Sequence, residues 1–257
     1  MTLKNKFKVL FIFLLFNLAA CESVDSDDVR TSGVYADISV SANGAGNTRV
    51  KARLKVGGVF SNTDLELERG DQLIASATGG ASIIMREDQE FLGGVEYKAT
   101  FLFDTENTRF NVAFNRPSGI SAPNSYVIMP ASILIVTPNA GQTFNRSDSV
   151  TLSWTPVSNN MSRLRIYSSS SRCTDANGQE IFSSSNSNSI SSVVDPGSVT
   201  QVASSYIAAN ALSDPTATCT VTFRAERTQE GVLDSAFGEG GIISANRYDE
   251  VQITVVP

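Results

Sequence analysis

The chain has 257 residues with 20 basic and 26 acidic side chains, a formal net charge of −6, three cysteines and no histidine. The acidic balance argues against nucleic acid as a partner, because nucleic-acid binding needs a basic surface. The absence of histidine excludes Ser-His-Asp triads, Cys-His dyads and histidine-ligated zinc sites, and we expect neither a metal nor a cofactor.

The N-terminus contains the parts of a secretory signal. Three lysines precede the apolar run VLFIFLLF at residues 9–16, and small residues follow it. The apolar segment is shorter than the roughly 20 residues that a membrane-spanning helix needs. We therefore expect residues 1–20 to be a cleaved signal peptide. Its removal would take away three lysines and no acidic residue, which shifts the charge from −6 to −9.

The expected cleavage site indicates how the mature protein is held. The sequence Leu18-Ala19-Ala20-Cys21 resembles the lipobox of bacterial lipoproteins, in which the cysteine carries a diacylglycerol. The resemblance implies a lipid at Cys21 that binds the protein to a membrane, and two or three acyl chains anchor a protein durably. Glu22 is not the aspartate associated with inner-membrane retention, so the resemblance implies the outer membrane, facing the periplasm or the cell surface. An ordinary signal peptide with a chance cysteine is the alternative.

Residues 21–32 are predicted to form a short flexible tether. The stretch ESVDSDDVRTSG is polar and acidic and lacks apolar periodicity, which is typical of flexible chain. Its three aspartates could bind a cation, but they do not match the spacing of a calcium loop.

From residue 33 onward the hydrophobic pattern has a period of two, which predicts an all-β protein. In TRVKARLKV at residues 48–56, apolar residues alternate with four basic ones, as in a half-buried strand. In the following TDLELER, Leu65 and Leu67 alternate with acidic residues. We expect the acidic and basic stripes to pair, which contributes about 0.2–1 kcal/mol per pair. Contact of the basic stripe with anionic lipid is the alternative.

Two β-sandwich domains are expected, at residues 33–130 and 131–257. Pro130 and Pro138 bracket the boundary, because proline suits linkers and edge strands. In the second domain, SVTLSWTPV carries Trp154, and the stretches ILIVTPNAG and IAANAL flank it on either side along the chain. This pattern resembles bacterial fibronectin type III or immunoglobulin-like sandwiches. It departs from antibody domains because Trp154 precedes both later cysteines.

Cys173 and Cys219 remain once Cys21 is assigned to the lipid. An even number of cysteines in an exported protein favours a disulfide, which for a loop of this length stabilises the fold by about 4 kcal/mol. A redox pair is the alternative, although no Cys-x-x-Cys motif is present.

Three segments are candidate binding loops. Residues 115–125 contain two prolines and a glycine together with Arg116 and Asn124, and could form a rigid recognition loop. The Ser-rich residues 183–192 are predicted to be a solvated loop with a glycan-binding alternative. Residues 229–250 are predicted to be a long loop between two strands. In it, Phe237 either plugs the end of the sandwich or makes an exposed contact.

These observations favour a non-catalytic outer-membrane lipoprotein that acts as a scaffold or binding module for an envelope protein or a glycan. No Gly-x-Ser-x-Gly, Ser-x-x-Lys or phosphate-binding glycine loop is present. A carboxylate-dependent enzyme acting on glycans is one alternative. A surface adhesin that binds carbohydrate or a host protein is the other.

Overall fold

A computed structural model describes residues 23–90, 94–156, 162–192, 195–207 and 209–257. The predicted signal peptide and Cys21 lie outside these residues. No helix in this part of the chain is long and apolar enough to span a membrane. Most of the described residues lie in strands that pack as sandwiches, and the helices are short, which confirms the predicted all-β class.

The elements follow the chain from β1 to β18. The strands are β1 (Ser23–Asp25), β2 (Val34–Ala42), β3 (Thr48–Val56), β4 (Asp64–Glu66), β5 (Gln72–Ala77), β6 (Ser82–Ile84), β7 (Arg86–Glu90), β8 (Gly94–Phe101), β9 (Arg109–Asn115), β10 (Ala122–Ile128), β11 (Ile135–Thr137), β12 (Thr143–Asn145), β13 (Ser149–Trp154), β14 (Arg163–Thr174), β15 (Glu180–Ser192), β16 (Ser198–Val202), β17 (Thr218–Glu230) and β18 (Gly241–Val256). The short helices are η3 (Ser26–Asp28), η4 (Thr31–Gly33), η5 (Ala203–Tyr206) and α2 (Ala209–Leu212).

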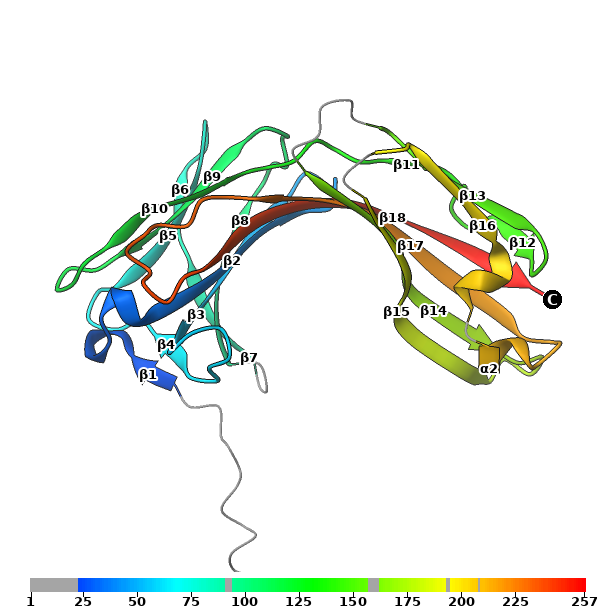
Figure 1. Cartoon of the computed structure of the whole chain (residues 1–257), viewed down its shortest axis with the longest axis horizontal. Helices are drawn as coiled ribbons and strands as arrows, with labels where there is room; N and C mark the ends of the chain where they lie inside the picture. Colours follow the sequence, from blue (N-terminus) through cyan, green and yellow to red (C-terminus); the bar gives the residue numbers. More distant parts are fainter. Residues whose placement is uncertain (1–22, 91–93, 157–161, 193–194, 208) are drawn as a thin grey trace, which may run out of the picture.

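One eleven-stranded sheet runs through the whole molecule. Its main path has the order β1-β4-β3-β2-β18-β17-β14-β15, with β12 beside β18, β8 beside β3 and β7 beside β8. Figure 1 shows that this sheet curves as an arch and that two smaller sheets lie on its convex side. One of these has the order β10-β9-β5-β6 and the other β11-β13-β16. Each smaller sheet closes a sandwich over one end of the arch.

Two hydrophobic cores fill the two sandwiches, and β18 contributes to both. Ile243 and Ala245 belong to the first core, together with residues from Val34 to Met129. Ile253 and its neighbours on β18 belong to the second core. Since alternate residues of a strand share a face, one face of β18 packs against both cores, and its other face looks out on the concave side. Residues 231–247, placed in the second sandwich by the sequence analysis, thus pack with the first core. The division at residue 130 stays a prediction.

The basic and acidic stripes pair only in part as expected. Arg53 on β3 forms a bidentate ion pair with Asp64 on β4, with both N–O distances 2.8 Å. Asp64, one of the acidic residues that alternate with Leu65 and Leu67, is buried. Its carboxylate is compensated there by Arg53 and by the Val95 amide, which donates to Oδ2 at 3.0 Å. Lys51 instead pairs with Glu96 on β8 at 3.0 Å.

Residues 23–32, expected to belong to a flexible tether, form ordered elements. β1 pairs in parallel with β4, and Ser26 and Thr31 are buried. The Arg116 guanidinium donates to the carbonyl oxygens of Ser26 and Val29. The polar composition of the segment did not predict these elements. Its backbone is held by pairing with β4 and by hydrogen bonds from Arg116, and not by burial of apolar side chains.

The predicted Ser-rich loop is also a strand. Residues 183–192 lie in β15, which pairs with β14 in antiparallel register. An edge strand obtains its backbone hydrogen bonds from one neighbour, so it can form without apolar alternation in its sequence.

The predicted loop 229–250 is shorter than expected, because β17 extends to Glu230 and β18 begins at Gly241.

The predicted disulfide is present. Cys173 on β14 lies directly opposite Cys219 on β17, with a Cα–Cα distance of 4.0 Å. Both residues are fully buried in the second core. The bond therefore fastens two neighbouring strands of the large sheet.

Candidate functional site

Phe237 is a core residue. It is 4% exposed, and its ring stacks on Phe114 with the centroids 6.1 Å apart. The loop 231–240 that carries it follows β17 and folds onto the first sandwich, where the Val232 and Tyr126 backbones exchange two hydrogen bonds of 2.8 Å. Of the two interpretations of Phe237, the structure shows the plug, and its ring is not available to a ligand.

The Arg116 side chain is buried and has a structural role. Its Nε donates to Asp71 Oδ2 at 2.9 Å, with the side chains 6% and 7% exposed. Its other nitrogens hold the backbone of the N-terminal segment, with 2.7 Å from Nη1 to the Val29 carbonyl oxygen. Because its donors are occupied by the protein itself, Arg116 is not a free cation for a ligand.

Asn124 is exposed, and its backbone joins the two predicted loops. The Asn124 amide donates to Asp234 Oδ2 at 2.7 Å, and the Asp234 amide donates to Ser125 Oγ at 3.0 Å. Between the N-terminal segment, residues 116–120 and residues 235–238 lies a groove of about 730 Å³. The structure therefore brings the two loops together, but their interlocking contacts build the end of the sandwich.

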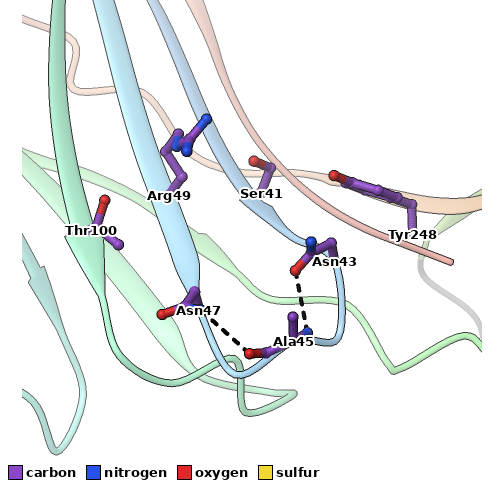
Figure 2. Close-up of a pocket in the computed structure, with 7 residues that line it drawn as sticks. All are labelled: Ser41, Asn43, Ala45, Asn47, Arg49, Thr100 and Tyr248. Atoms are coloured by element: carbon purple, nitrogen blue, oxygen red, sulfur yellow. Dashed lines mark hydrogen bonds between the residues drawn. The ribbon is translucent and has the colours of Figure 1, made fainter.

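A second hollow lies on the concave face of the large sheet, and the sequence analysis did not single it out. Its volume is about 270 Å³, and its lining residues come from β2, the β2–β3 hairpin, β3, β8 and β18. Figure 2 shows these residues, which are Ser41, Asn43, Ala45, Asn47, Arg49, Thr100 and Tyr248. All but Ala45 carry polar groups. We call this hollow the Arg49 pocket.

Strand register places the floor of the Arg49 pocket in one row. Arg49 lies opposite Thr100 on one side and opposite Ser41 on the other, and Ser41 lies opposite Asn246 of β18. The hairpin at the pocket edge is held by two local bonds, from the Ala45 amide to Asn43 Oδ1 at 3.2 Å and from Asn47 Nδ2 to the Ala45 carbonyl oxygen at 3.3 Å (Figure 2). The pocket is thus built on a paired sheet rather than on a long loop.

Arg49 is the cation of this pocket. Its side chain is exposed, and among the described residues it forms no ion pair or side-chain hydrogen bond. The next basic residues on the same face of β3 differ, because Lys51 pairs with Glu96 and Arg53 pairs with Asp64. Arg49 therefore keeps its guanidinium donors for a group from outside the chain.

Tyr248 connects the pocket to a polar cluster in the middle of the arch. The Arg224 guanidinium lies over the Tyr248 ring at 3.8 Å and donates to Glu250 Oε1 at 2.8 Å. Arg224 also contacts the hydroxyl of Tyr167, which donates to Glu226 Oε2 at 3.1 Å. Burial and the Glu226 charge raise the pKa of Tyr167. These contacts hold the rings of Tyr167 and Tyr248 in place. They also make the concave face of the large sheet polar between the two sandwiches.

The charges beside the pocket are compensated. Lys98 lies 2.8 Å from Glu96 and 2.6 Å from Asp88. Burial alone would raise the pKa of Glu96, but the hydrogen bonds from Lys98 and Lys51 outweigh it and hold the pKa below its ordinary value. Within the described parts of the chain, no group of three or more cysteine, aspartate or glutamate residues could hold a metal ion. The pocket can therefore supply one cation, hydroxyls, amides and an aromatic ring.

The sequence contained only part of the signal for this pocket. The alternation around residue 50 places Arg49 on the outer face of its strand. Its lack of a partner depends on which strands lie beside β3, and these are β2, β4 and β8. Tyr248 lies on β18, which pairs with β2 and comes from the other end of the chain. No local pattern could bring Tyr248 to Arg49.

Comparisons with known proteins identify no family for this chain. No protein-family model and no curated protein matches the sequence. Among solved structures, the chain is similar to the Yersinia pseudotuberculosis adhesin InvE, with 14% identity and a TM-score of 0.25 over 88% of this chain and 59% of that chain. It is also similar to Escherichia coli alpha-2-macroglobulin, with 11% identity and a TM-score of 0.24 over 86% of this chain and 14% of that chain. The fibronectin(III)-like modules of Clostridium thermocellum CbhA give 9% identity and a TM-score of 0.21 over 86% of this chain and 90% of theirs. Because these scores are low, no activity or partner is drawn from these proteins.

Proposed function

We propose that this chain is a non-catalytic binding module of the bacterial cell envelope, held at the outer membrane by a lipid on Cys21. Its ligand binds on the concave face of the arch, in the Arg49 pocket. The lipobox-like residues 18–21 support the anchor. The position of one uncompensated arginine in a polar pocket supports the binding site.

The chemistry of the pocket favours a ligand with an acidic group and several hydroxyls. An arginine recognises a carboxylate or phosphate through paired, charge-assisted hydrogen bonds. Ser41, Asn47 and Thr100 add neutral donors and acceptors of the kind that hydroxyl groups pair with. Tyr248 adds an aromatic edge to the pocket. An acidic sugar offers all of these groups at once, so the proposed ligand class is an acidic glycan.

The test is calorimetric titration of the full-length protein with uronic-acid oligosaccharides and with neutral oligosaccharides of the same length. Arg49→Ala should weaken binding of the acidic series at least about tenfold, since charge-assisted hydrogen bonds contribute about 1.5–3 kcal/mol. Lys55→Ala is the matched control, because Lys55 lies on the same face of β3 about 20 Å away. Equal losses in the two variants, or equal binding of acidic and neutral sugars, would contradict the site.

The anchor is tested separately by metabolic labelling with palmitate. Label should enter the wild-type protein and be absent from Cys21→Ser. Recovery of the mature wild-type protein with a free thiol at residue 21 would rule out the anchor.

A further inference from the structure

The turn between β3 and β4 carries two apolar residues at its tip. The Ser61 amide donates to the Gly58 carbonyl oxygen at 3.1 Å, so Val59 and Phe60 occupy the two central positions of a β-turn. Phe60 is 96% exposed and Val59 is 49% exposed. Central turn positions are usually filled by Gly, Pro, Asn, Asp or Ser. Two large apolar residues at such a tip therefore need a reason.

The fold itself does not supply that reason. The turn is closed by the Val56 amide, which donates to the Thr63 carbonyl oxygen at 3.0 Å, and by a bond of 3.1 Å from the Thr63 amide to Ser61 Oγ. Gly57 and Gly58 have φ angles of 85° and 97°, which glycine adopts readily. Neither apolar tip residue belongs to a hydrophobic core. Their side chains can therefore change without opening a cavity in either core.

The turn lies beside the point where the N-terminal segment enters the fold. β1 and β4 are parallel, and Ser23 lies opposite Asp64. The chain that leads into β1 and the turn that leads into β4 therefore lie at the same end of this strand pair. Cys21 precedes Ser23 by two residues, which span at most about 7 Å. An anchor at Cys21 would hold this end of the sandwich close to the bilayer.

The ordered N-terminal segment makes this placement specific. Ser26 is buried, and Arg116 binds the Ser26 and Val29 carbonyl oxygens, so no long flexible tether follows Cys21. Leu102 provides the contrast. It is 86% exposed, but it follows Phe101, which pairs with Thr48 at the far end of β3. This position is about 27 Å from Val56 along the strand.

We infer that Val59 and Phe60 insert into the interface of the lipid bilayer to which Cys21 is attached, and so orient the arch relative to the membrane. The inference rests on the proposed lipid anchor. An apolar contact next to an acyl anchor acts as a second membrane signal, and aromatic rings are well suited to the bilayer interface. The Glu239 carboxylate lies beside Gly58 at the base of the turn, because a Cβ built on Gly58 would be 3.5 Å from Glu239 Oε2. This negative charge is therefore not at the tip that would enter the bilayer.

The experiment places a nitroxide label at residue 60 or residue 102 of the full, lipidated protein in phosphatidylethanolamine–phosphatidylglycerol vesicles. In Phe60→Cys and Leu102→Cys only the new thiol reacts, because Cys173 and Cys219 form a disulfide and Cys21 carries the lipid. The accessibility of each label to oxygen and to a water-soluble nickel complex is then measured. Residue 60 should show the oxygen-rich, nickel-poor signature of the membrane, and residue 102 the signature of water.

An aqueous signature at residue 60 in lipidated protein overturns the inference and leaves the anchor intact. The mass of the N-terminal peptide from the same sample decides the anchor separately, and an unlipidated Cys21 would refute both. The variant Val59→Ser/Phe60→Ser should keep the thermal midpoint of the wild type, because the turn is closed by backbone bonds. A large drop in the midpoint would show that the two residues are structural and would also overturn the inference.

Discussion

The buried ion pair between Arg227 and Asp195 should contribute strongly to stability where the two sandwiches meet. Arg227 Nη2 lies 2.6 Å from Asp195 Oδ2, and the two side chains are 0% and 1% exposed. Asp195 Oδ1 also accepts a hydrogen bond from Trp154 Nε1 at 2.7 Å. Arg227 further donates to the backbone carbonyl oxygens of Ser132 and Thr155. Arg227 thus connects β17 both to Asp195, which lies between β15 and β16, and to Ser132 in the segment that joins the sandwiches.

Asp195→Asn keeps the shape of the side chain and removes its charge. The Arg227 charge then stays buried without compensation, which costs about 3–5 kcal/mol. With a urea dependence of about 3 kcal/mol/M, the unfolding midpoint should fall by about 1 M or more. The assay is urea unfolding followed by Trp154 fluorescence, since this tryptophan contacts the mutated group.

Glu180→Gln is the matched control. Arg172 and Glu180 are also 2.6 Å apart, but their side chains are 67% and 41% exposed. An exposed pair of this kind contributes at most about 1 kcal/mol, so its loss should shift the midpoint only slightly. If the two variants lost equal stability, the argument that burial sets the contribution of Asp195 would be refuted.

Two further predictions concern the second core. Replacing both Cys173 and Cys219 by alanine should lower the free energy of unfolding by about 4 kcal/mol, and an unchanged urea midpoint would contradict this value. Burial raises the pKa of Tyr206 to about 12. The Tyr206 hydroxyl therefore ionises at lower pH in the unfolded chain than in the folded one. The stability that the neutral Tyr206 side chain contributes is complete below about pH 10 and is lost as the pH rises towards 12. Urea midpoints from pH 8 to 11 should fall less steeply in Tyr206→Phe than in the wild type, and parallel slopes would contradict the shift.

The sequence predicted well the features that depend on local alternation. Val50, Ala52 and Leu54 are fully buried on β3 as expected, and Trp154 faces the second core. These positions follow from the two-residue repeat of a strand against a hydrophobic core. The disulfide was predicted because Cys173 and Cys219 remain as a pair once Cys21 is assigned to the lipid.

The sequence failed where non-local pairing decides the structure. The Ser-rich stretch forms β15 because it pairs with the edge of β14, and residues 23–32 are ordered because β1 pairs with β4 and Arg116 binds their backbone. Residues 241–247 joined the first sandwich because β2 pairs with β18 across about 200 residues of chain. The same pairing placed Tyr248 near Arg49, so the candidate site could not be predicted from either segment alone.

The strands β17 and β18 pair without interruption from Cys219–Val255 to Glu230–Ser244, and they cross from one sandwich to the other (Figure 1). A hinge at the crossing would have to break several of these backbone hydrogen bonds together. The continuous β17–β18 pair therefore resists bending and keeps the two ends of the arch at a constant separation. A partner that touches both ends must match that length, and it would lose little binding energy to reorganisation of the arch.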